Sequence, residues 1–83
     1  MNRLIRVAVA AVDKDKVLAD ATLAQIMDDC AYVHDGNQAL LDLAERMLTD
    51  GVNEHDVAVM RQEAEAIRDT IGLVLQNIDD LKR

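Results

Sequence analysis

The chain contains no proline, phenylalanine, tryptophan or serine, and has one tyrosine and one cysteine among its 83 residues. A core must therefore be built from aliphatic residues, Met and Ala, and this composition favours helices over sheets. The absence of serine excludes a serine nucleophile. The single cysteine, Cys30, cannot form an internal disulfide, and such cysteine usage is typical of a reducing compartment.

The charge is acidic and unevenly distributed. The chain carries a net charge of −7 at pH 7. Residues 1–16 are basic overall, whereas residues 28–69 hold most of the acidic side chains. An acidic body repels the phosphates of nucleic acids and anionic lipids, so we expect neither nucleic acid nor a membrane as a partner. The charge suits a basic protein surface, or simply maintains solubility.

The first residues resemble a signal peptide in having early arginines and an apolar run. That run covers only residues 7–12, and the Ala8-Val9-Ala10 pattern lies inside it rather than after it. No stretch is long enough to span a membrane, so we expect a cytoplasmic protein. Residues 1–12 fit either a strand or a helix face, and their alanine content favours a helix. The polar residues 13–16 then mark a break before the next helix.

Two long stretches repeat apolar residues at alternating spacings of three and four, the a/d heptad pattern of a helix that packs against another helix. In the C-terminal stretch the pattern is unbroken. Its positions are Val57, Met60, Ala64, Ile67, Ile71, Val74, Ile78 and Leu81. The stretch before it has the same spacing with one polar member, Asn37, which either fixes the register or faces the gap beside Gly36. Its positions are Leu23, Ile26, Cys30, Val33, Asn37, Leu40, Ala44 and Met47.

A turn separates the two stretches. Gly51 is a helix stop, because glycine readily adopts the left-handed backbone found after a helix C-terminus. Asn53 is a typical N-cap for the helix that follows. We therefore expect a helix over 16–49, a turn over 50–53 and a second helix over 53–82, packed antiparallel because the connection is short.

One antiparallel register aligns every a position of one helix with a d position of the other, from Met47 opposite Val57 to Leu23 opposite Leu81. On the flank, Gly36 lies opposite Thr70, where the missing side chain would let the backbones approach. Gly36 either breaks the first helix or leaves it continuous, and the unchanged phase of the pattern favours continuity. The predicted fold is all-α, a single small domain formed by a long antiparallel helical hairpin.

Two further apolar lines lie outside this predicted seam, and a lone helix pair is marginal in water. We predict that the N-terminal segment covers one line and that dimerisation, or another protein, covers the rest, completing a four-helix bundle. Tyr32 joins the surface as an exposed tyrosine among acidic residues. The predicted interaction surface is Met27, Tyr32, His34, Leu41, Leu48, Val59, Ala66 and Leu73.

Candidate chemistry is sparse. Cys30 and His34 have an i, i+4 spacing that suits metal ligands, but two ligands do not make a site, and His55 lies far along the hairpin. We interpret Cys30 as a buried seam residue with a flanking histidine. The cluster at residues 54–56 is expected at a helix start, where acids favour the helix dipole. We predict no catalytic residues, no metal and no cofactor.

The sequence thus indicates a non-enzymatic, acidic helical protein that acts by protein–protein interaction, as an adaptor, co-chaperone, inhibitor or regulator. The alternative is a purely homodimeric structural or regulatory four-helix bundle, and a metal-binding or enzymatic role is a third hypothesis. Helical hairpins of this size also occur among plasmid-encoded RNA-binding proteins, small secretion co-chaperones and phage inhibitors of bacterial defence. An RNA-binding role conflicts with the acidic body.

Overall fold

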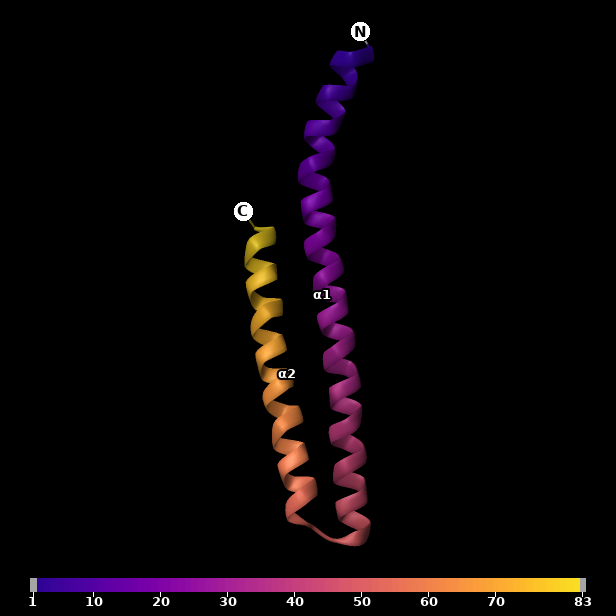
Figure 1. Cartoon of the computed structure of the whole chain (residues 1–83), viewed down its shortest axis with the longest axis vertical. Coiled ribbons are helices and arrows are strands. Elements are labelled where there is room, and N and C mark those ends of the chain that lie inside the picture. The colour runs from indigo at the N-terminus through magenta and orange to yellow at the C-terminus, as the bar shows by residue number, and fades with distance from the viewer. Residues whose placement is uncertain (1, 83) are drawn as a thin grey trace.

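A computed structural model describes the backbone of residues 2–82 and the side-chain surroundings of residues 14–82. It contains two helices, α1 over Asn2–Asp50 and α2 over Glu54–Leu81. They pack as an antiparallel hairpin that measures 72 × 19 × 15 Å (Figure 1). The predicted hairpin is therefore confirmed, and no strand occurs in the described part of the chain.

The first helix is longer than predicted. It begins at Asn2 rather than near residue 16, so the N-terminal segment is helical and the polar residues 13–16 do not interrupt it. Lysine is a good helix former, and an aspartate that is not needed as a cap fits a solvent-exposed helix. The helix also runs through Gly36 without a break. Whether residues 1–12 cover an apolar line concerns side chains outside the described residues.

The turn has the predicted construction. Gly51 adopts a φ of 97°, and its N–H donates to the carbonyl of Met47 at 2.8 Å, which closes the end of α1. Asn53 caps α2, because its side-chain oxygen accepts a hydrogen bond from the N–H of Asp56 at 2.8 Å. The two helices are therefore joined by three residues with defined hydrogen bonds.

An ion pair clamps the hairpin beside the turn. Asp56 is buried, and Arg46 of α1 donates to both of its carboxylate oxygens, at 2.7 Å from Nη2 and 3.2 Å from Nε. The side-chain amide of Asn53 donates to the same carboxylate at 2.8 Å. Two-pronged pairing of this kind fixes geometry as well as charge. It holds the Asp56 side of α2 against α1.

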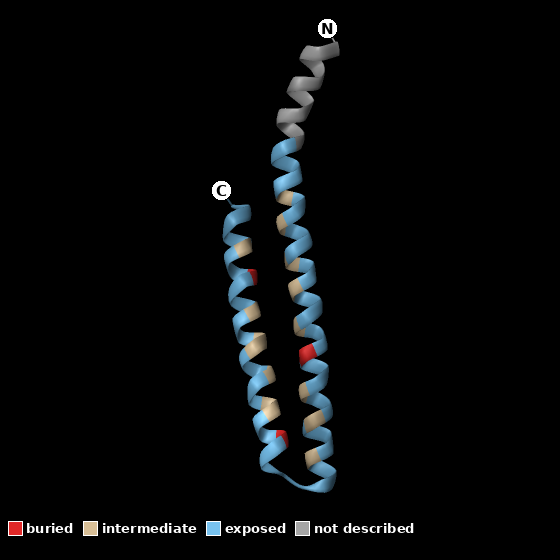
Figure 2. Cartoon of the chain, viewed as in Figure 1, coloured by how far each residue is buried: buried red, intermediate tan, exposed pale blue. Residues whose placement is uncertain are grey.

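The contact between the helices differs from the predicted a/d seam. In both helices d and g heptad positions are covered and face the neighbouring helix, and α2 adds the half-buried c positions Val59 and Ala66 (Figure 2). The covered d positions are Ala19, Ile26, Val33, Leu40 and Met47 on α1, with Met60, Ile67 and Val74 on α2, whereas the predicted d position Leu81 is exposed. The g positions are Thr22, Asp29, Gly36 and Leu43 on α1, with Asp56, Glu63, Thr70 and Asn77 on α2. The a positions, predicted to be covered, are all exposed.

Relative to the predicted a/d contact, each helix is rotated so that its g positions, rather than its a positions, face the other helix. Two features on the g side explain this rotation. Gly36 is buried, and a Cβ atom built there would lie 2.7 Å from Oε1 of Glu63 and 3.0 Å from Cδ1 of Ile67. The predicted close approach at Gly36 is thus found, although these two side chains, rather than Thr70, fill the space. The Arg46–Asp56 pair draws the same side of the helices together at the turn. Glycine and a partly buried ion pair therefore turn the g positions inward.

The hairpin has almost no core of its own. Val74, 9% exposed, is the only buried apolar side chain among residues 14–82. Hydrophobic residues nevertheless make up 51% of the chain. Its accessible surface is 6839 Å², whereas a compact monomer of 9.2 kDa is expected to expose about 4,900 Å². Much apolar surface is therefore left open.

Candidate interaction face

The exposed apolar residues collect on one face of the hairpin, which we call the interaction face and define by the a and e positions. In an antiparallel pair that touches through d and g, the a and e positions of both helices fall on the same side. On α1 they are Leu23, Met27, Cys30, His34, Asn37, Leu41, Ala44 and Leu48. On α2 they are Val57, Arg61, Ala64, Arg68, Ile71, Leu75, Ile78 and Lys82. All sixteen are exposed.

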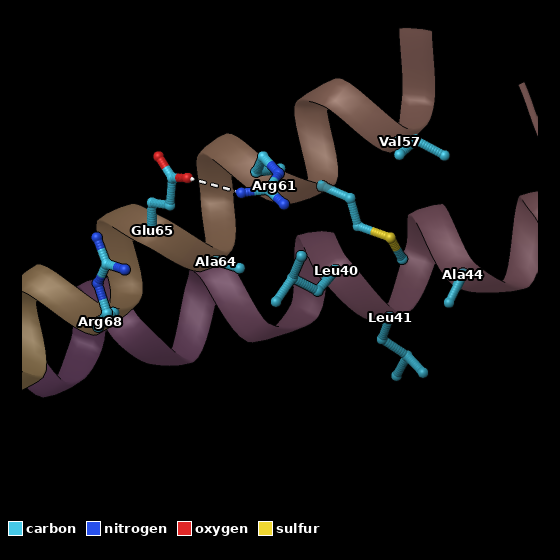
Figure 3. Close-up of a pocket in the computed structure, with 9 residues that line it drawn as sticks. Leu40, Leu41, Ala44, Val57, Arg61, Ala64, Glu65 and Arg68 are labelled. Carbon is cyan, nitrogen blue, oxygen red and sulfur yellow. Dashed lines mark hydrogen bonds and ion pairs between the residues drawn. The ribbon is translucent and has the colours of Figure 1, made fainter. Parts of the chain in front are cut away.

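A groove runs along this face between the helices. It has a volume of about 810 Å³, and mainly apolar side chains line it (Figure 3). The lining residues are Leu40, Leu41, Ala44, Val57, Met60, Arg61, Ala64, Glu65 and Arg68. Ala44 and Ala64 leave it wide, because small residues stand where two larger ones would close it. Leu41 points outward from α1 beside it (Figure 3).

The large apolar side chains of this face are strongly solvated. Leu48 is 88% exposed and Met27 is 71% exposed. Six others are exposed to a lesser degree: Leu23, Leu41, Val57, Ile71, Leu75 and Ile78. Single exposed hydrophobic residues are normal on proteins, but a contiguous apolar surface rimmed by polar residues marks an interaction site.

The charge pattern distinguishes this face from the rest of the molecule. Within residues 23–48 and 57–82, every aspartate and glutamate occupies a position other than a or e. Arg61 and Arg68 stand at the rim of the groove on α2. Arg61 is 3.5 Å from Glu65, and Arg68 is 3.6 Å from Asp69, both as exposed pairs that contribute little to stability. The a and e positions within these ranges therefore carry no carboxylate, although the protein as a whole is acidic.

The eight residues of the predicted interaction surface divide between two faces. Met27, His34, Leu41 and Leu48 are e positions of α1 and lie together on the interaction face. The other four are c positions, which adjoin the g positions on the opposite side of the hairpin. Of these, Tyr32 and Leu73 are exposed, whereas Val59 and Ala66 are half-buried. The structure therefore does not unite the predicted surface.

The a positions of α2 belong to the candidate interaction face, although the apolar spacing predicts that they form the hairpin's own contact. Val57, Ala64, Ile71 and Ile78 were assigned to the hairpin's own contact, yet each is exposed. The g positions of α2 are all polar, and this regular pattern could have indicated that the hairpin contact lies on the g side. Small and polar residues there suit a close, partly polar helix contact, which leaves the apolar a positions free for another one.

Cys30 is exposed, so its predicted burial in the seam is wrong. The reason is the rotation of α1 toward its g positions, which carries the a position of Cys30 out of the contact. Cys30 and His34 both lie on the interaction face, and His55 lies at the start of α2. Among the residues whose side chains are described, no three His, Cys, Asp or Glu side chains are grouped to hold a metal ion.

Asp56 belongs to the cluster of acidic residues and histidine at residues 54–56. Its carboxylate accepts hydrogen bonds from Asn53 and Arg46. Hydrogen bonding from Asn53 is the main reason why the pKa of its carboxyl lies below the usual value of 3.8. Burial acts in the opposite direction, and Arg46 adds to the lowering of the pKa. The carboxylate is therefore held ionised as part of the clamp beside the turn.

The chain matches no protein-family model, and no curated protein or solved structure is detectably similar to it. Among the described residues, neither helix contains a stretch apolar and long enough to cross a bilayer. Its function must therefore be argued from the interaction face.

Proposed function

We propose that this chain is a non-enzymatic interaction protein that docks its interaction face onto another protein surface, as an adaptor, co-chaperone, inhibitor or regulator. The observation that carries this proposal is the mainly apolar face, whose a and e positions hold no carboxylate, on an otherwise acidic hairpin. Burying apolar surface contributes roughly 25 cal/mol for each Å² removed from water, so such a face favours docking.

The shape of the face indicates the kind of surface that it would bind. A groove between two parallel ridges of side chains accepts an apolar helix laid along it. The acidic outer surfaces of both helices would attract basic residues at the margin of such a contact and raise the rate of encounter. The same surfaces disfavour nucleic acids and anionic lipids as partners.

A photo-reactive amino acid placed in the face tests this proposal in the native cell. We expect the probe at Leu41, beside the groove, to form covalent adducts with protein on irradiation. The matched control is the same probe at Asp35, an exposed position on the outer side of α1. Adducts that form equally from both positions, or from neither, would contradict the proposal.

The alternative function is a homodimeric structural or regulatory bundle, in which a second copy uses the whole face. The mass of the adducts distinguishes the two functions, because a homodimer yields a product with twice the mass of the chain. An adduct of any other mass contains a different protein and supports an adaptor or inhibitor.

A further inference from the structure

We infer that the occupant of the interaction face is a second copy of this chain, an inference that rests on the interaction face of the proposed function and selects its homodimeric alternative. The two hairpins stack face to face so that α1 of each copy lies on α2 of the other, with both turns at the same end. The result is a four-helix bundle with the a and d positions at its centre.

The angle between the two contact lines favours a square bundle. Successive residues turn by about 100° around an α-helix, so the middle of the a and e positions lies about 110° from the middle of the d and g positions. Adjacent neighbours of a helix are about 90° apart in a square four-helix bundle and about 60° apart in a three-helix bundle. A second hairpin therefore fits the face better than a single helix does.

The area left open is sufficient for a stable dimer. The hairpin exposes 6839 Å², about 1,900 Å² more than a compact monomer of its mass. A standard protein interface removes about 800 Å² from each partner. The surplus exceeds this requirement even though some of it belongs to the elongated shape.

Charge complementarity selects the relative orientation. Two-fold symmetry allows either each helix to lie on its own copy or α1 to lie on the α2 of the other subunit. The rim of α2 carries Arg61 and Arg68 with Glu65 and Asp69 beside them, whereas the charged residues on the outer edge of α1 are acids such as Asp42 and Glu45. The first arrangement places arginines beside arginines and acids beside acids, whereas the second pairs opposite charges twice.

The height of a residue, meaning its position along the long axis of the hairpin, determines which residue of the other subunit it faces. This makes the orientation testable. Gly36 contacts Ile67, and Thr22 lies beside Asp80 at the open end. By interpolation, Met27 and Leu75 lie at nearly the same height, both at exposed e positions. In the proposed dimer, residue 27 of one subunit therefore faces residue 75 of the other.

The first test measures the mass of the full chain by sedimentation equilibrium. We expect twice 9.2 kDa for the parent protein. Met27→Asp and Ile71→Asp, two independent variants on the interaction face, should weaken the dimer by about 100-fold or more, because each buries an unpaired charge. Leu73→Asp on the opposite side should leave the parent mass. A monomeric parent, or dissociation caused by Leu73→Asp alone, overturns the inference.

The second test uses disulfide formation between two differently labelled chains, both carrying Cys30→Ser. Chains with Met27→Cys are mixed with chains carrying Leu75→Cys under mild oxidation. We expect mixed disulfides between residues 27 and 75 to form at least about tenfold faster than either homodisulfide, because the reacting thiols face each other. Predominant homodisulfides would overturn the proposed orientation.

The inference and the function on which it rests can fail separately. A monomeric parent that still forms adducts with a different protein from position 41 refutes the dimer and leaves the interaction function standing. A monomer without any adduct from position 41 refutes both.

Discussion

The two faces of the hairpin are built from the same two helices but differ in what they do with apolar residues. The interaction face exposes leucine, isoleucine, valine and methionine and keeps carboxylates away. The opposite face, defined by the g and c positions, carries Asp29, Glu63 and the Arg46–Asp56 clamp, and most of its g residues are covered by the neighbouring helix. The hairpin thus covers its more polar side and leaves its more apolar side open.

This difference shows that a heptad pattern alone does not say which of its apolar positions the hairpin itself covers. An apolar stripe wider than the a/d seam is expected where a helix has two neighbours. In α1 the stripe extends from d positions such as Leu40 through a positions to e positions such as Leu41. The hairpin accounts for one edge of that stripe, and the interaction face for the other.

The largest expected effect comes from placing a charge on the interaction face. Ile71→Asp should cost about 3–5 kcal/mol of stability in the proposed assembly, because it leaves a buried charge without a partner. Leu73→Asp, two residues along the chain and on the opposite face, should cost less than about 1 kcal/mol, since Leu73 stays exposed. Chemical denaturation at equal protein concentration measures both. Similar losses for the two variants would erase the distinction between the faces.

A second comparison tests the close approach on the g side. Gly36→Leu should destabilise the hairpin by about 1–3 kcal/mol, because the new side chain meets Ile67 and Glu63. Gly72→Ala is the matched control, since nothing lies within 4 Å of the added Cβ atom. It should stabilise α2 by about 0.5–1 kcal/mol through helix propensity. A Gly36→Leu variant as stable as the parent would mean that the helices do not meet at this position.

The clamp beside the turn predicts an acid-dependent loss of stability. The pKa of Asp56 is lower in the folded chain than its usual value of 3.8, so the ionised form stabilises the fold above that pH. The contribution is lost as the pH falls below about 4 and the carboxyl is protonated. In a plot of melting temperature against pH, Asp56→Asn should therefore reduce the fall in melting temperature at acidic pH. Asp28→Asn, at an exposed site, should leave that fall in place, and an unchanged profile for Asp56→Asn would contradict the role of the clamp.

The smallest effect concerns Asp29, a half-covered g position. Its Oδ1 accepts a hydrogen bond from Gln25 at 3.0 Å, whereas its Oδ2 is buried without a partner. Asp29→Ala should stabilise the hairpin by about 1 kcal/mol beyond the gain from Asp28→Ala, which reports helix propensity alone. Equal gains from the two variants would show that the unpaired oxygen costs nothing.

Local features of the fold could be predicted because they depend on neighbours in sequence. Gly51 and Asn53 act within a few residues, so their roles as helix stop and cap follow from residue type, and both are confirmed. The heptad spacing predicted two long antiparallel helices for the same reason. The start of α1 at Asn2 was not predicted, because residues 13–16 are equally good as caps or as exposed helix.

The rotation of the helices could not be predicted from apolar spacing. Rotation by one position exchanges the a line for the g line, and the choice depends on contacts between residues distant in sequence. Gly36 with Ile67, and Arg46 with Asp56, are such contacts. For the same reason, half of the predicted interaction surface falls on one face and half on the other.

Val74 is the single buried apolar side chain among residues 14–82, so docking of the interaction face would contribute much of the protein's stability. A chain that gains most of its apolar burial by docking is stabilised by mass action, and each tenfold fall in free partner removes about 1.4 kcal/mol. Chains without a partner would unfold more often and be degraded first by proteases. The cellular level of the protein would then follow the supply of its partner, and excess chains would be removed without a dedicated regulator.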